Sequence, residues 1–149
     1  MVAHPEETIQ LIEVGSSTHT EALSLRFEIL REPLGMPKGS EVHESESLIW
    51  HFVALQGGKV VGCVLLLPNF EKKTGRLLQM AVEPSLQGQG LGRRLVLALE
   101  SHAAEKGIRL VQMHARKVAI PFYEKLGYIC SGEVFEEVGI PHRIMSREL

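Results

Sequence analysis

The sequence contains few cysteines, and its charge is close to balanced. Its two cysteines, Cys63 and Cys130, are too few for a disulfide-stabilised scaffold, and it has no Cys-x-x-Cys pair for zinc. Sixteen Lys and Arg residues stand against eighteen Asp and Glu, for a formal net charge of -2. This balance excludes binding to nucleic acid or to a membrane surface through bulk positive charge. We therefore expect neither as a partner.

Long hydrophobic runs are also missing. No apolar stretch approaches the roughly 20 residues that a membrane-spanning helix needs. The N-terminal segment, residues 1–7, lacks the basic start and apolar run of a signal peptide. Hydrophobic residues still make up 44% of the 149 positions, which is enough to build a core. We expect one domain over residues 1–149, located in the cytoplasm.

The residue pattern predicts a mixed α/β fold. Thr18 and Glu21 form a capping box, with Thr18 as the N-cap of a helix that runs to about residue 33. Gly57-Gly58 predicts a hairpin between two strand-like runs. The expected strands are residues 8–14, 48–55, 59–67, 76–82, 108–115, 128–135 and 143–147, and the later helices are residues 91–106 and 118–126. This order indicates a sheet with antiparallel hairpins first and a crossover unit later.

The most informative stretch is the glycine turn, Gln87-Gly88-Gln89-Gly90-Leu91-Gly92, which follows a predicted strand and opens a predicted helix. Glycine permits a positive φ and lets a ligand approach the backbone amides. Free N–H groups at a helix start bind phosphate, so the turn predicts a diphosphate held by main chain. Arg93 and Arg94 break the dinucleotide and P-loop patterns. A glycine-rich connector without a ligand is the alternative.

Two motifs in this chain resemble those of the GNAT N-acetyltransferases. Gln87-x-x-Gly90-x-Gly92 is similar to the family's Q/R-x-x-G-x-G/A signature, which holds the pyrophosphate of acetyl-CoA. Residues 119–128 are similar to its A-x-x-x-Y-x-K-x-G-F/Y element, and residues 80–84 to its fourth strand. The tail, residues 135–142, resembles a bacterial subgroup whose substrates are mostly unassigned.

The resemblance implies both a fold and a reaction. The fold is a mixed, mostly antiparallel central sheet with flanking helices and a splayed strand pair that binds CoA. The reaction moves the acetyl group of acetyl-CoA, a co-substrate, to a primary amine of a small molecule or peptide, by direct attack in a ternary complex and without a metal. A CoA-binding or sensing module without turnover is the alternative, and a homodimer is an open possibility.

The resemblance also assigns roles to residues. Tyr123 occupies the position of the family's general acid, and a tyrosine that packs its ring in the core is the alternative. Arg116 stands where many members have Asn, which suggests contact with a phosphate of CoA. The residues expected to bind acetyl-CoA are Met80, Ala81, Val82, Gln87, Gly88, Gln89, Gly90, Leu91, Gly92, Arg93, Arg116 and Phe122.

The general base is poorly marked. His142 and Glu137 lie in the tail that borders the acceptor cleft of this fold, and an imidazole or a buried carboxylate there would deprotonate an ammonium group. Glu83 follows the predicted strand 76–82, and we expect it to be a solvated turn residue rather than the general base. The other histidines show no metal-ligand spacing, so we predict no metal site.

The acceptor itself is not marked either. The acidic run Glu41, Glu44 and Glu46 would attract a cationic amine, or else forms a solvated loop. Arg26 and Arg31, on the first helix, are expected to form a solvated basic edge, and the alternative is that they line the acceptor side of the cleft.

Overall fold

The computed structural model describes residues 7–149. Residues 1–6, which carry most of the segment examined for a signal peptide, lie outside the described residues. The strands are β1 (Thr8–Ile12), β2 (Trp50–Gln56), β3 (Lys59–Asn69), β4 (Thr74–Val82), β5 (Leu110–Arg116), β6 (Ile129–Glu137) and β7 (Ile140–Glu148). The helices are α1 (Ser17–Leu30), α2 (Leu91–Glu105) and α3 (Ile120–Lys125). Short 3-10 turns occupy Glu32–Leu34, Glu46–Leu48, Pro84–Leu86 and Lys117–Ala119. No helix between residues 7 and 149 has the length and apolar character to cross a membrane.

The strands form one sheet in the order β1-β2-β3-β4-β5-β7-β6. Every neighbouring pair is antiparallel except β4 and β5, which are parallel. The expected mixed, mostly antiparallel sheet is therefore confirmed. Gly57 and Gly58 both have positive φ, 57° and 80°, and they close the β2–β3 hairpin that the sequence predicted.

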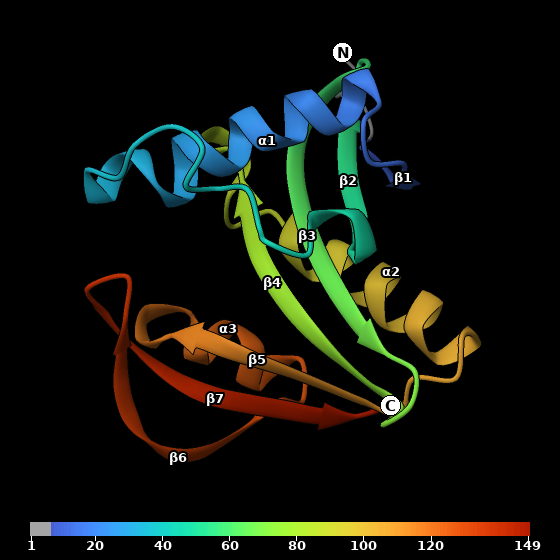
Figure 1. Cartoon of the computed structure of the whole chain (residues 1–149), viewed down its shortest axis with the longest axis vertical. Coiled ribbons are helices and arrows are strands. Elements are labelled where there is room, and N and C mark those ends of the chain that lie inside the picture. Colours follow the sequence, from blue (N-terminus) through green and yellow to red (C-terminus); the bar gives the residue numbers. More distant parts are fainter. Residues whose placement is uncertain (1–6) are drawn as a thin grey trace.

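The parallel pair separates partway along its length. β4 and β5 are paired only between Thr74–Leu77 and Leu110–Met113, and they diverge beyond that point (Figure 1). The cause is an irregularity in β4: Gln79 has φ 45°, and the register with β3 shifts between Cys63 and Leu65. Such a bulge bends a strand and increases its twist. The C-terminal half of β4 therefore has no partner strand on its β5 side.

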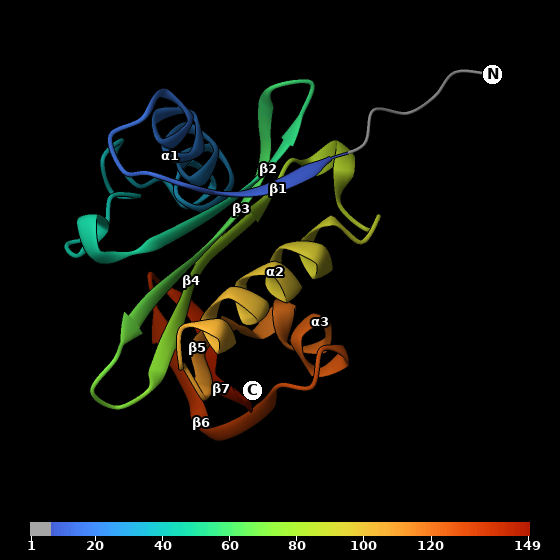
Figure 2. The same cartoon turned by 90° about the vertical axis from the view of Figure 1, so that its right-hand side faces the viewer.

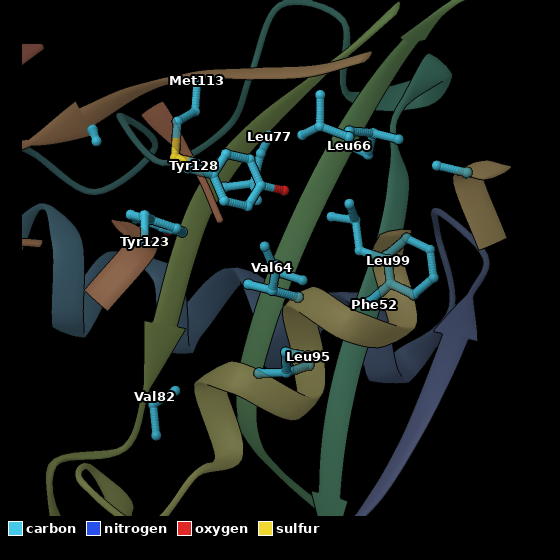
Figure 3. Packing of buried hydrophobic residues seen from close by; sticks show 14 of the residues in the cluster. Phe52, Val64, Leu66, Leu77, Val82, Leu95, Leu99, Met113, Tyr123 and Tyr128 are labelled. Carbon is cyan, nitrogen blue, oxygen red and sulfur yellow. The ribbon is translucent and has the colours of Figure 1, made fainter. Parts of the chain in front are cut away.

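The two faces of the sheet are covered by different helices. Figure 2 shows α1 on one face and α2 with α3 on the other. Alternate side chains of a strand point to opposite faces, so β5 contributes Val111, Met113 and Ala115 to the core under α2 and α3. Figure 3 shows that core, including Val64, Leu95, Leu99 and Met113. His114 and Arg116 project toward the α1 side.

Some predicted boundaries were wrong. The N-cap of α1 is Ser16, not Thr18, because the Ser16 hydroxyl accepts a hydrogen bond from the His19 N–H at 3.1 Å. The helix ends at Leu30 and a 3-10 turn follows, since Pro33 has no N–H to continue the α-helical hydrogen bonds and its ring would clash with the carbonyl four residues before it. β7 begins at Ile140, earlier than predicted, because Val138 and Gly139 form a tight turn with positive φ.

Candidate active site

A cleft of about 890 Å³ opens where β4 and β5 diverge. It brings together most of the predicted site residues, from six different elements and the glycine turn. Those that line it are Met80, Ala81, Val82, Gln87, Gly88, Gly90, Gly92, Arg93, Arg116, Phe122, Tyr123, Glu137 and His142. Two do not. The Gln89 amide donates to the Ser85 carbonyl at 3.2 Å, and Leu91 packs in the core.

The glycine turn presents free backbone at the start of α2. Gly88 and Gly90 have φ values of 78° and 85°, which glycine adopts readily. Gly90 is the N-cap of α2, and no side chain caps the helix. A Cβ placed on Gly88 or Gly90 would meet nothing within 4 Å, so the space above both is open. The first N–H groups of α2 and the helix dipole therefore face a space that fits an anion.

Gly92 and Gln87 hold this turn in place through contacts with α3 and β4. A Cβ on Gly92 would lie 3.2 Å from Cζ of Phe122, so the absence of a side chain lets α2 approach the Phe122 ring. The Gln87 amide donates to the Val82 carbonyl at 2.9 Å and ties the turn to the end of β4. Both residues fix the position of the turn relative to the open edge of β4.

Tyr123 lies at the buried side of the cleft. Its ring meets Phe122 edge-on at 4.9 Å and Tyr128 at 5.8 Å, and only 5% of the residue is exposed. Its hydroxyl has no hydrogen-bond partner within residues 7–149. Burial raises the pKa of Tyr123 above the usual value for a phenol, so its hydroxyl stays protonated. The arrangement leaves one proton donor free at the cleft.

A cluster of charged and imidazole groups lies on the other side of the cleft. Oε1 of Glu137 is 2.9 Å from Nδ1 of His114, and Oε2 is 3.8 Å from Nε2 of His142. Arg76 Nη2 lies 3.9 Å from the Glu137 carboxylate and 3.0 Å from His114 Nδ1. Burial acts to raise the pKa of Glu137, but the His114 hydrogen bond and the charges of His142 and Arg76 outweigh it, so its pKa is below the usual range. Glu137 is therefore ionised near neutral pH.

His142 is held in a defined orientation. Its Nδ1 lies 2.9 Å from the Ile140 carbonyl, and its ring stacks on Phe135 at 6.0 Å. Because a carbonyl only accepts, the proton of the neutral ring is assigned to Nδ1. The lone pair of Nε2 is then free on the side that faces Glu137.

Arg26 differs from the expectation of a solvated edge, which was wrong. It is fully buried, its Nη1 donates to Oε2 of Glu46 at 2.7 Å, and its Nε donates to Oε1 of Gln79 at 2.7 Å. Its Nη2 also donates to the Glu41 carbonyl. The guanidinium therefore ties the loop after α1 to the bulge that splays β4.

The acidic run is consequently not a solvated loop. Glu41 is buried, Glu46 is paired with Arg26, and only Glu44 is exposed. Burial acts to raise the pKa of Glu46, but hydrogen bonds from Arg26, His19 and the His43 N–H outweigh it and lower the pKa to about 2. The charge of Glu46 is compensated internally.

His19, Glu46 and His51 lie close enough to suggest a metal site. His19 Nδ1 accepts from the Gly15 N–H at 3.1 Å, so its proton sits on Nε2, 2.8 Å from Glu46. A metal ion would compete with that proton and with the charge of Arg26. The group is therefore a hydrogen-bond network around a buried ion pair.

Arg31 and Arg116 line the α1 side of the cleft. Arg31 Nη1 and Arg116 Nη2 both donate to the Leu30 carbonyl, at 3.3 and 3.1 Å. The alternation along β5 thus directs Arg116 toward the end of α1, on the face opposite the glycine turn. The sequence offered Arg31 for the acceptor side and Arg116 for the cleft, but it predicted neither their meeting at the Leu30 carbonyl nor the His114–Glu137 contact. The motifs gave no signal for either.

Comparison with known proteins assigns the family. Residues 18–128 match the acetyltransferase (GNAT) family. A Bacillus subtilis protein provisionally named as an acetyltransferase is 33% identical over 143 residues, covering 94% of this chain and 95% of its own length. The structure of Escherichia coli ElaA aligns with a TM-score of 0.84 at 21% identity, over 96% of this chain and 100% of that one. An aminoglycoside 6'-N-acetyltransferase complexed with coenzyme A aligns with a TM-score of 0.78 at 19% identity, over 95% of this chain and 96% of that one. This chain belongs to the GNAT family of acetyltransferases.

Proposed function

We propose that this protein transfers the acetyl group of acetyl-CoA to a primary amine in a ternary complex. The observation that carries the proposal is the open glycine turn, which lies directly beside the unpaired edge of β4. Free N–H groups at a helix start suit a pyrophosphate, and an unpaired strand edge suits an extended amide-containing arm. The two occur together at one end of one cleft.

The residues of the cleft divide the binding between them. The N–H groups of Gly88 to Arg93, with the Arg93 side chain, would hold the pyrophosphate. The β4 edge from Met80 to Val82 and the Phe122 ring would hold the pantetheine arm. Acetyl-CoA supplies an acetyl thioester, and the chain supplies position and charge. The structural neighbour complexed with coenzyme A supports this assignment.

Groups on opposite sides of the cleft carry out the two proton transfers. His142 Nε2 accepts a proton from the acceptor amine, and the Glu137 carboxylate, 3.8 Å away, stabilises the imidazolium that results. The amine nitrogen forms a bond to the acetyl carbon and the C–S bond breaks. Tyr123 donates its phenolic proton to the leaving sulfur, and the second proton that the nitrogen loses on becoming an amide restores the phenol. The products are an N-acetylated amine and CoA with a free thiol.

Incubation of the protein with acetyl-CoA and a panel of amines tests the proposal. The panel contains a polyamine, an aminoglycoside, a lysine peptide and free amino acids, and the readout is thiol release together with the mass of the product. We expect thiol release that depends on the amine and equals the acetylated product in amount. Binding of acetyl-CoA without amine-dependent release from any compound would instead support a non-catalytic CoA-binding module.

A further inference from the structure

Two arginines meet at a single oxygen atom on the α1 side of the cleft. Arg31 Nη1 and Arg116 Nη2 donate to the Leu30 carbonyl from two different elements. The remaining contact of Arg31 is a 3.3 Å hydrogen bond from Nε to the Ser40 carbonyl. A guanidinium has five N–H donors, so most donors of both groups are left without a protein acceptor among the described residues.

Neither arginine contacts a carboxylate within residues 7–149. Other arginines of the chain do: Arg26 pairs with Glu46 at 2.7 Å, and Arg147 pairs with Glu100 at 2.7 Å. Two half-buried cations beside each other repel. Burial, together with the charge of neighbouring arginines, lowers the pKa of both Arg31 and Arg116, although Glu137 and Glu41 partly offset this for Arg31. A bound anion would relieve this repulsion.

The charges that line the cleft are strongly unequal. Its described lining includes five Arg and Lys side chains and one carboxylate, Glu137. Arg93 and Lys125 belong to α2 and α3, on the face where the proposed pyrophosphate site lies. Arg31 and Arg116 lie on the opposite face, so the phosphates at the glycine turn do not account for them. Glu46 does not balance them either, because Arg26 already pairs with it.

We propose that the acceptor amine carries an anionic group, a carboxylate or a phosphate, which Arg31 and Arg116 bind together. Planar guanidinium groups match the oxygens of both anions. The ammonium end of the same molecule would face Glu137 and His142, so the acceptor is recognised as a zwitterion. This inference rests on the proposed function and narrows its substrate class.

Matched pairs of ligands test the inference directly. Protein saturated with CoA is titrated with β-alanine and its amide, and with O-phosphoethanolamine and ethanolamine, while binding is followed by NMR. In each pair, one member lacks the anion and both keep the amine. We expect at least one member that carries the anion to bind about tenfold more tightly than its partner that lacks it, since charge-assisted hydrogen bonds are the stronger ones. The carboxylate and phosphate pairs distinguish the two anions.

Variants locate the site. Arg31→Gln and Arg116→Gln should each remove most of the preference for the anionic member, and Arg31→Lys should retain part of it. Arg109→Gln serves as the control, because Arg109 is exposed and does not line the cleft. Melting temperatures verify that each variant is folded.

Equal affinity within both pairs, no binding of either anionic compound, or a preference that survives in both Gln variants would overturn the inference. Its failure is separable from failure of the proposed function. Acetyl-CoA binding and acetylation of a purely cationic amine would leave the function standing while the inference fails. If CoA itself did not bind, the same titrations on CoA-free protein would still report on the arginine pair.

Discussion

Two tyrosines five residues apart show how similar side chains take different roles. The Tyr128 hydroxyl donates to the buried Glu100 carboxylate at 2.8 Å, whereas Tyr123 has no such partner among the described residues. The hydroxyl of Tyr128 is thus fixed by the fold, and that of Tyr123 is free at the cleft.

Tyr123→Phe should lower kcat by about 10²–10⁴, which is the usual contribution of a general acid. The ring and its packing are retained, so acetyl-CoA affinity and the melting temperature should change little. Steady-state kinetics with an acceptor from the amine panel measure the effect.

Tyr128→Phe is the matched control. It should lower the free energy of unfolding by about 1–3 kcal/mol, because Glu100 loses a buried donor, and leave kcat nearly unchanged. Full activity in Tyr123→Phe would remove that residue from the mechanism. A collapse of its melting temperature would show that the hydroxyl serves the fold.

His142→Asn should reduce kcat by about 10²-fold or more. The Asn amide can still donate to the Ile140 carbonyl, but it offers no basic nitrogen to the cleft. His102→Asn, outside the cleft, should keep kcat close to that of the wild type. An unchanged rate in His142→Asn would show that another group accepts the amine proton.

Motifs located part of this site from sequence. The glycine turn and Tyr123 lie in short local patterns, so their positions could be predicted. Arg26 contacts Glu46 and Gln79 across 20 and 53 residues, and only folding brings them together. His114 and Glu137 meet for the same reason. Long-range polar pairs leave no periodic signal in the sequence.

At the level of elements, the bulge in β4 creates the cleft. Gln79 adopts φ 45°, which is uncommon for a residue other than glycine, and it contacts both Arg26 and the Glu41 carbonyl.

The helix-end signals and hairpin glycines allowed the elements to be predicted. The N-cap was misplaced because Ser16 and Thr18 are both good capping residues, and the sequence pattern favoured the wrong one.

Gln79→Ala should reduce the free energy of unfolding by about 1–3 kcal/mol, since it leaves Nε of the buried Arg26 without its acceptor. We also expect weaker acetyl-CoA binding, because the edge of β4 depends on the bulge. Urea denaturation and calorimetry measure the two effects. Gln112→Ala, at an exposed position of β5, is the control. Stability equal to that of the wild type would show that the Arg26–Gln79 contact does not hold the bulge.

At the scale of the whole molecule, one buried ion pair links α1, its following loop and the sheet. The pKa of Glu46 falls from 4.5 to about 2 on folding, so the unfolded chain binds more protons between these values. Stability from this group is therefore fully present above about pH 4.5 and is lost as pH falls toward 2, an effect of about 3 kcal/mol.

Glu46→Gln should destabilise the protein by about 3–5 kcal/mol at pH 7, because it leaves the charge of Arg26 buried and unpaired. The free energy of unfolding of this variant should also fall less steeply between pH 4.5 and 2 than that of the wild type. Glu44→Gln, an exposed neighbour in the same loop, should do neither. Urea denaturation at several pH values measures both. If the free energy of unfolding of Glu46→Gln fell between pH 4.5 and 2 as steeply as that of the wild type, the loss would not come from Glu46.

The central claim, that the glycine turn holds acetyl-CoA, is tested most directly by calorimetric titration of two glycine variants. Gly90 and Gly107 flank the two ends of α2, have φ values of 85° and 88°, and have nothing within 4 Å of an added Cβ. Valine at either position therefore imposes similar backbone strain, of about 1–2 kcal/mol. Only at Gly90 does the side chain enter the proposed pyrophosphate site. We predict that Gly90→Val loses acetyl-CoA binding, while Gly107→Val binds like the wild type. Equal binding by both variants and the wild type would contradict the account.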